Sequence, residues 1–83
     1  IMGLAEMEYH LGLALRTLGS ITPEPPGLRK RLTDLRARVH AARAAFFGTP
    51  PTRSPGDLAA ELTTMRTEMK AVHQQVVKAG PHP

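Results

Sequence analysis

The fold of this chain is decided by residues 28–76, which read LRKRLTDLRARVHAARAAFFGTPPTRSPGDLAAELTTMRTEMKAVHQQV. Both halves of this stretch carry apolar residues at alternating spacings of three and four, the pattern of helices that pack as coiled coils. We call each such line of positions a seam, and the two seams are Leu28, Leu32, Leu35, Val39, Ala42 and Phe46, then Leu58, Leu62, Met65, Met69, Val72 and Val76. When the seams are paired in opposite directions, the two residue numbers at every level add to the same total. The spacing therefore predicts an antiparallel hairpin of helices at 26–47 and 55–79.

Residues 2–18 extend the pattern with a third seam, made of Leu4, Met7, Leu11, Ala14 and Leu18. When these positions are paired in the opposite direction with the seam of 26–47, their residue numbers again add to one constant total. The three helices therefore share the same layers of core residues. At the last level Phe46 and Leu58 find only Ile1, so this end is either frayed or completed by residues outside this chain, and we favour the second. The predicted fold is all-α, an up-down-up antiparallel three-helix bundle with coiled-coil-like heptad seams.

Proline and glycine mark where the predicted helices end. The stretches SITPEPPG at 20–27 and GTPPTRSPG at 48–56 are rich in proline, which cannot continue a helix. Ser54 directly precedes the third helix, where its hydroxyl is expected to accept a hydrogen bond from a backbone N–H of the first turn. We assign residues 1–80 to a single bundle and 81–83 to a disordered tail.

Composition narrows the class of protein. The 83 residues include no Cys, carry a formal net charge of +4, and contain no apolar run long enough to span a bilayer. Without Cys there is no disulfide, no thiolate metal site and no Cys nucleophile, which favours an intracellular protein, cytoplasmic or nuclear. Because the chain begins with Ile1, we expect it to be a piece of a longer protein.

Charged residues beside the seams distinguish the two ways of winding three helices. The favoured winding places opposite charges across the seams, with Arg31 and Arg38 facing Glu61 and Glu68, and Arg36 facing Glu8. The other winding brings arginines against Arg66 and His73. We therefore expect the first winding, although exposed ion pairs contribute only about 0 to 1 kcal/mol each.

The sequence does not indicate an enzyme. The seam positions are all apolar, so none supplies an acid, a base or a nucleophile to the interior. His10, His40 and His73 belong to three different predicted helices, and none is followed by a His or a carboxylate three or four residues later. We therefore interpret them as solvated side chains. We therefore predict no catalytic residue, no metal site and no cofactor.

Two sets of apolar residues point away from the seams and are candidates for binding a partner protein. The first lies on residues 2–18 and the second on residues 26–47, and together they comprise Met2, Tyr9, Leu13, Ala37, Ala41, Ala44 and Phe47. A closed bundle has no use for this surface, although isolated exposed apolar residues are ordinary. Both sets favour an interaction module.

Residues 26–47 are also the most basic part of the chain. In the favoured winding Arg29, Lys30 and Arg43 have no predicted carboxylate partner, so an acidic ligand is expected to bind there first. Nucleic acid is a possible ligand of this kind, but the cations are spread around the helix and no aromatic residues interleave with them for base stacking.

The function expected from the sequence is a non-catalytic protein–protein interaction module, an adaptor or scaffold domain of a larger intracellular protein. Its partner is expected to be another protein that offers a helix or an acidic segment. Two alternatives stay open, a basic helical domain that binds nucleic acid and a coiled-coil assembly segment of a multisubunit complex. Oligomerisation is possible, as a coiled-coil assembly segment would require. No membrane-spanning segment is expected.

Overall fold

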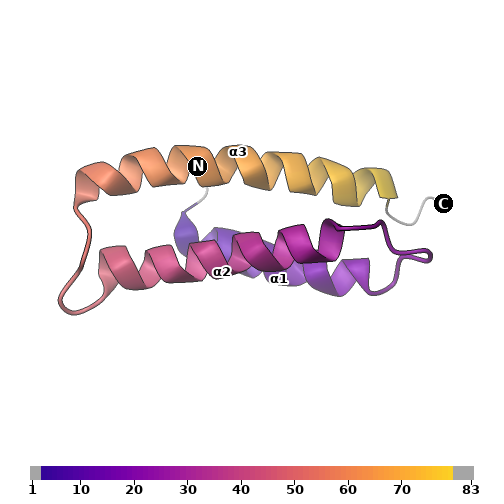
Figure 1. The fold of residues 1–83 in the computed structure, drawn as a ribbon, viewed down its shortest axis with the longest axis horizontal. Helices are drawn as coiled ribbons and strands as arrows, with labels where there is room; N and C mark the ends of the chain where they lie inside the picture. Colours follow the sequence, from indigo (N-terminus) through magenta and orange to yellow (C-terminus); the bar gives the residue numbers. More distant parts are fainter. Residues whose placement is uncertain (1–2, 80–83) are drawn as a thin grey trace.

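The computed structural model describes residues 3–79, which form the three helices α1 (Leu4–Leu18), α2 (Leu28–Phe47) and α3 (Pro55–Ala79). The helices lie side by side, with α2 running opposite to α1 and α3 (Figure 1). All three pairs of helices pack against each other. The predicted all-α three-helix bundle is therefore confirmed.

The seams of the three helices form one apolar core. The side chains that are buried in it are Leu4, Met7, Leu11, Leu18, Leu28, Leu32, Leu35, Val39, Ala42, Phe46, Met65, Met69, Val72 and Val76. The remaining seam residues, Ala14, Leu58 and Leu62, are half-buried against this core. Two residues that the spacing did not predict, Leu15 and Ile21, also pack on it. Every buried residue of the described chain is hydrophobic, so packing is the main source of stability.

The helices end where the sequence predicts but two of them begin later. Helix α2 begins at Leu28 instead of residue 26, because Gly27 has a φ of 78°, a left-handed conformation that cannot lie inside a right-handed helix. Helix α1 begins at Leu4 because Gly3 has an extended backbone. Met2 and the predicted disordered tail at 81–83 lie outside the described residues.

The turn between α2 and α3 is held by local hydrogen bonds. The backbone N–H of Asp57 donates to Ser54 Oγ at 3.3 Å, which confirms the predicted cap of α3. At the end of α2 the N–H of Gly48 donates to the carbonyl of Ala44 at 3.0 Å. A Cβ at Gly48 would lie 2.4 Å from that carbonyl oxygen, so this close approach requires glycine.

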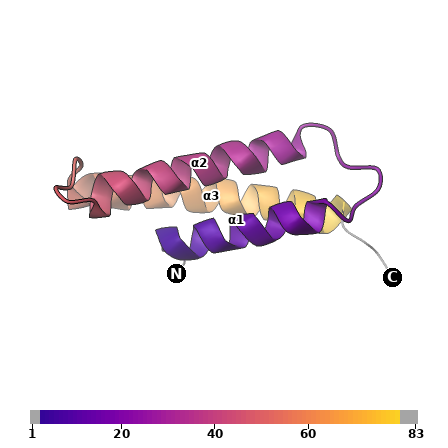
Figure 2. The ribbon, with the colours of Figure 1, turned by 90° about the horizontal axis from the view of Figure 1, so that it is seen from below.

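The turn also covers the end of the core that the spacing left open. Helix α1 is shorter than its neighbours, so the α2–α3 end projects beyond it (Figure 2). Phe46 is nevertheless only 8% exposed. The guanidinium of Arg53 lies 4.7 Å from the centre of its ring, and the N–H of Arg53 donates to the carbonyl of Ala45 at 3.1 Å. A residue of this chain therefore covers Phe46, a role that the sequence analysis assigned to residues outside the chain.

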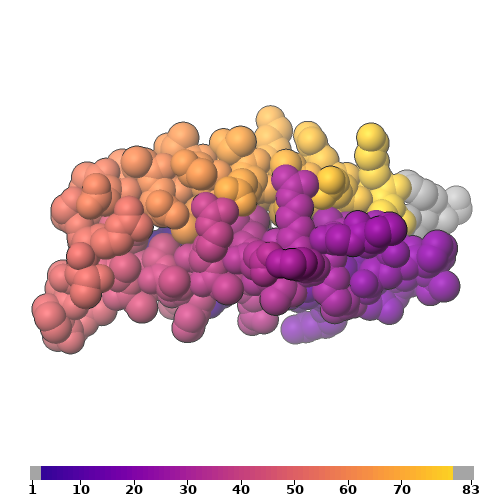
Figure 3. Space-filling model, viewed as in Figure 1, coloured from indigo at the N-terminus to yellow at the C-terminus, as the bar shows by residue number. Residues whose placement is uncertain are grey.

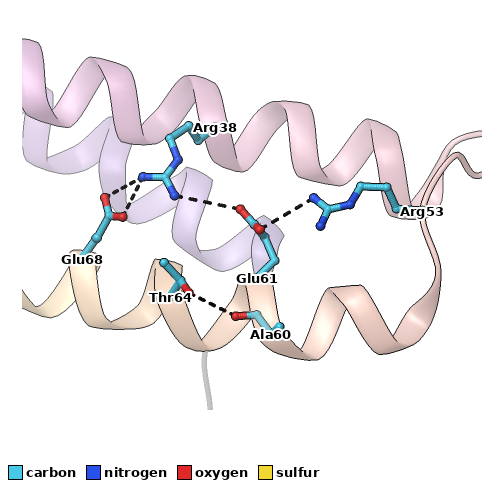
Figure 4. A network of polar contacts seen from close by, with 6 residues as sticks. All are labelled: Arg38, Arg53, Ala60, Glu61, Thr64 and Glu68. Carbon is cyan, nitrogen blue, oxygen red and sulfur yellow. Dashed lines mark hydrogen bonds and ion pairs between the residues drawn. The ribbon is translucent and has the colours of Figure 1, made fainter.

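The seam between α2 and α3 carries the ion pairs predicted for Arg38. Arg38 Nη1 lies 2.7 Å from Glu68 Oε1, and Arg38 Nη2 lies 4.0 Å from Glu61 Oε1 (Figure 4). Arg31 faces α3 as predicted, but it donates to the amide oxygen of Gln75 at 2.9 Å and not to a carboxylate. The space-filling view shows the side chains of α2 and α3 meeting along this seam (Figure 3). These contacts belong to the favoured winding.

The seam between α1 and α2 differs from the prediction in one pair. The Glu8 carboxylate is hydrogen-bonded by His40 Nδ1 at 2.8 Å and by the guanidinium of Arg43. The predicted Arg36–Glu8 pair is therefore wrong. The Arg36 guanidinium instead lies over Gly12, 3.7 Å from the position of a Cβ at that residue, because a glycine leaves room for a long side chain to cross α1.

Candidate docking groove

The third seam, between α1 and α3, is the most open of the three. Helix α1 packs most extensively on α2 and least on α3. A groove with a volume of about 770 Å³ lies between α1 and α3. Its walls come from two parallel helices, with His10 and Thr17 at the two ends on α1 and Arg66 and Val77 at the two ends on α3. The groove therefore follows the long axis of the bundle.

The floor of the groove is apolar. Leu13 and Ala14 contribute to it from α1, and Met69, Val76 and Val77 contribute from α3. Met69 and Val76 are buried parts of the core, whereas Val77 is 58% exposed. Val77 therefore extends the apolar lining of the groove to the surface of the bundle.

The rim of the groove is basic. It is made by the side chains of His10, Arg66, Lys70 and His73, together with the neutral Thr17. None of the described residues that line the groove is acidic. A cleft lined by one sign of charge concentrates its electrostatic field, so this groove attracts anionic groups.

Comparison with protein-family models, with curated proteins and with solved structures finds no match for this chain. A function for this chain therefore has to be inferred from the geometry of its own surface. None of the three described helices carries an apolar stretch long enough to cross a membrane. Within residues 3–79 no group of three or more His, Asp and Glu side chains is placed to hold a metal ion.

The first predicted partner surface borders the groove. Tyr9 is 64% exposed, and its ring meets the ring of His10 edge to face, with centroids 5.5 Å apart. Leu13 is half-buried and lines the groove itself. Tyr9 and Leu13 therefore belong to one surface with the apolar residues of α3. Met2, the third residue predicted for this surface, lies outside the described residues.

The second predicted partner surface lies on the other side of α1. Ala37, Ala41, Ala44 and Phe47 are all exposed, and Phe47 is 67% exposed. Ala44 and Phe47 line a hollow of about 610 Å³ against the first turn of α1, whose walls also include Glu6 and Arg43. This hollow has charges of both signs. It therefore offers less electrostatic selectivity than the groove between α1 and α3.

The predicted site for an acidic ligand rested on three cations without carboxylate partners, and that premise is wrong. Arg29 Nη2 lies 2.6 Å from Glu24 Oε1, Lys30 Nζ lies 2.7 Å from Asp34 Oδ2, and Arg43 binds Glu8. The hydrogen bond from Arg29 lowers the pKa of the Glu24 carboxyl below its ordinary value. Glu24 belongs to the turn between α1 and α2, and its contact with the first turn of α2 was not predicted from the sequence.

The basic rim of the groove was not predicted from the sequence. Arg66 and His73 are seven residues apart and directly follow the seam residues Met65 and Val72, so they share one flank of α3. The favoured winding turns this flank towards α1. The signal was therefore present, but His10 and His73 were interpreted one at a time as solvated histidines. Only the packing of α1 beside α3 brings the two histidines to one groove.

Proposed function

We propose that this chain is a non-catalytic docking module that binds another protein through the groove between α1 and α3. The observation that carries the proposal is the apolar floor of the groove, which continues the core to the exposed Val77 and lies beside the exposed Tyr9. An apolar groove with polar groups at its edges is a common form of binding site. An adaptor or scaffold role in a larger intracellular protein fits such a module.

Several features support a non-catalytic role. The buried side chains of the described chain are all hydrophobic, whereas acid–base catalysis depends on polar groups held in fixed positions within a pocket. The imidazoles of the groove, His10 and His73, are both exposed. The rim is therefore suited to attract and orient a partner.

The test uses the double variant Tyr9→Ser/Val77→Ser, because both side chains are exposed and their loss leaves the core intact. The wild-type chain is immobilised, the protein that it retains from a cell extract is identified by mass spectrometry, and the complex is rebuilt from purified components. The double variant should weaken this complex at least tenfold with an unchanged melting temperature. Binding that survives in the double variant contradicts the proposed site.

Phe47→Ser is the matched control, since Phe47 is as exposed as Tyr9 but lies beside the hollow on the other side of α1. It should leave the affinity unchanged. If Phe47→Ser removes binding and the double variant does not, the docking surface lies at α2 and not at the groove.

A nucleic-acid-binding function is the second candidate, and the net charge of +4 and the basic rim favour it. Phosphate contacts release counterions, so such binding weakens steeply with salt. Fluorescence anisotropy with a labelled DNA duplex and a labelled single-stranded RNA measures this dependence. A loss of affinity of about a thousandfold between 50 and 200 mM salt would favour nucleic acid over a protein partner.

The third candidate is an assembly segment, in which these helices pair with those of other subunits. The molar mass in solution distinguishes this assembly function from the docking function. Sedimentation equilibrium of the isolated chain should give the mass of a monomer if the groove receives a different protein.

A further inference from the structure

We infer that the groove between α1 and α3 binds an acidic amphipathic helix of the partner protein, which packs there as a fourth helix of the bundle. This inference rests on the proposed docking function and specifies the chemistry of the partner. It is carried by three observations, namely the shape of the groove, its apolar floor and the sign of its rim.

The shape of the groove fits a helix. Its walls are two parallel helices, and it extends along α3 from Arg66 to Val77. At 1.5 Å per residue this distance is about 17 Å, or roughly three helical turns. A helix laid along it can place apolar residues at positions i, i+3, i+4 and i+7 on the floor. Leu13 and Val77 line the groove from the two different helices and would contact the two sides of that apolar face.

The rim of the groove determines the charge of the occupant. At the other two seams, cations of one helix meet carboxylates of the facing helix, as Arg38 meets Glu68 at 2.7 Å and Arg43 meets Glu8. The groove presents Lys70 and two histidines, and none of its described lining residues is acidic. A partner helix with Glu or Asp beside its apolar face would supply the carboxylates and repeat the pairing of the other seams.

The net charge of the chain disfavours a second copy as the occupant, and the apolar floor disfavours a nucleic acid. A second copy of this chain carries a net charge of +4 itself, so two copies repel each other. A nucleic acid would place charged phosphates against an apolar floor. Tyr9 is the aromatic residue at this edge of the described surface, whereas single-stranded nucleic acid is usually held by several stacking rings.

The experiment uses two synthetic helical peptides of three heptads each, with Leu at positions a and d. One peptide has Glu at positions e and g, and the other has Lys there. The full chain, labelled with ¹⁵N, is titrated with each peptide and followed by NMR. The acidic peptide should shift the amide signals of groove residues such as Leu13, Lys70 and Val77, and it should bind at least tenfold more tightly than the basic peptide.

Two charge reversals separate the groove from the general charge of the chain. Lys70→Glu and Lys30→Glu change the net charge equally, and both lysines are exposed, but only Lys70 lines the groove. Lys70→Glu should lower the affinity for the acidic peptide at least tenfold, whereas Lys30→Glu should lower this affinity less than threefold. Circular dichroism shows whether each variant keeps its helices. If the two variants lose affinity for the acidic peptide equally, the peptide is attracted by the general charge of the chain and the inference is overturned.

The inference is also overturned if the acidic peptide fails to bind, if the basic peptide binds as tightly, or if the shifted signals lie on α2 around Ala41. Its failure is distinct from failure of the docking function. If Tyr9→Ser/Val77→Ser abolishes the natural complex while the acidic peptide does not bind or compete, docking at the groove stands and the acidic helix is wrong. Displacement of the natural partner by the acidic peptide supports both.

Discussion

The guanidinium of Arg53 lies 4.7 Å from the centre of the Phe46 ring and covers the end of the core that α1 does not reach. Cation–π contacts of this kind contribute about 0.5 to 1 kcal/mol at exposed sites. Arg53 also approaches Glu61 Oε2 at 3.7 Å, so a single substitution removes two interactions. A double-mutant cycle with Arg53→Ala and Phe46→Leu isolates the ring contact. We expect a coupling energy of about 0.5 to 1 kcal/mol from urea unfolding, and a coupling near zero would contradict the stacking role.

Leu35 is 2% exposed and shares one core with Leu11 and Met69, as the levels of the three seams predict. Leu35→Ala should lower the free energy of unfolding by roughly 2 to 5 kcal/mol, because it leaves a cavity in a close-packed core. A loss of this size is a large part of the stability of a small domain. Thr33→Ala, at an exposed position of the same helix, should change the stability by less than about 0.5 kcal/mol. Equal effects of the two substitutions would contradict the central position of Leu35.

Ser54 and Thr49 lie at opposite helix ends within one turn. Ser54→Ala should cost about 0.5 to 2 kcal/mol, because it removes the acceptor for the N–H of Asp57. Ser54→Asp keeps an acceptor and places a negative charge at the positive end of α3, so the melting temperature should hold or rise. Thr49→Asp places the same charge just beyond the negative end of α2, so the melting temperature should fall. Shifts in the same direction would show that helix-end electrostatics do not govern this turn.

Gly48 and Gly3 offer a matched comparison at two helix ends. A Cβ at Gly48 would lie 2.4 Å from the carbonyl oxygen of Ala44, whereas a Cβ at Gly3 would meet nothing within 4 Å. Gly48→Ala should therefore destabilise the bundle by about 1 to 3 kcal/mol, since the backbone of the turn must shift. Gly3→Ala should be close to neutral in the same thermal melts. If Gly48→Ala is also neutral, the end of α2 adapts without cost.

Glu8 makes the stability of the α1–α2 seam depend on pH. Hydrogen bonds from His40 and then Arg43 lower the pKa of its carboxyl below the ordinary value for glutamate. A carboxyl whose pKa is lower in the folded state stabilises the fold above its ordinary pKa, and this contribution is lost as the pH falls through the lowered pKa. Glu8→Gln should therefore lower the stability near neutral pH, by at most about 1 kcal/mol, and should make the decline in acid shallower. Urea unfolding at a series of pH values measures how steeply the free energy of unfolding falls in acid for the wild type and for Glu8→Gln. Identical slopes for the two proteins would contradict this role of Glu8.

The positions of the core and the ends of the helices could be predicted from the sequence. Leu28, Leu35 and Val76 lie in the core because apolar spacing along a helix defines one side of that helix, whatever it packs against. The cap at Ser54 is equally local, since its partner lies three residues away. The later start of α2 was missed because the left-handed conformation of Gly27 is one of several that glycine adopts equally well.

The pairing of charges and the candidate groove were decided by the tertiary structure. Glu8 binds Arg43 and His40 instead of Arg36, because long side chains reach across several residues and the outcome depends on which neighbour leaves room, as Gly12 does. The groove likewise depends on how closely α1 approaches α3, and the spacing of their apolar residues sets the level of each contact but not the distance between helix axes. The sequence by itself therefore determined which side chains form the core, and only the packed helices determined where that core stays open beside a basic rim.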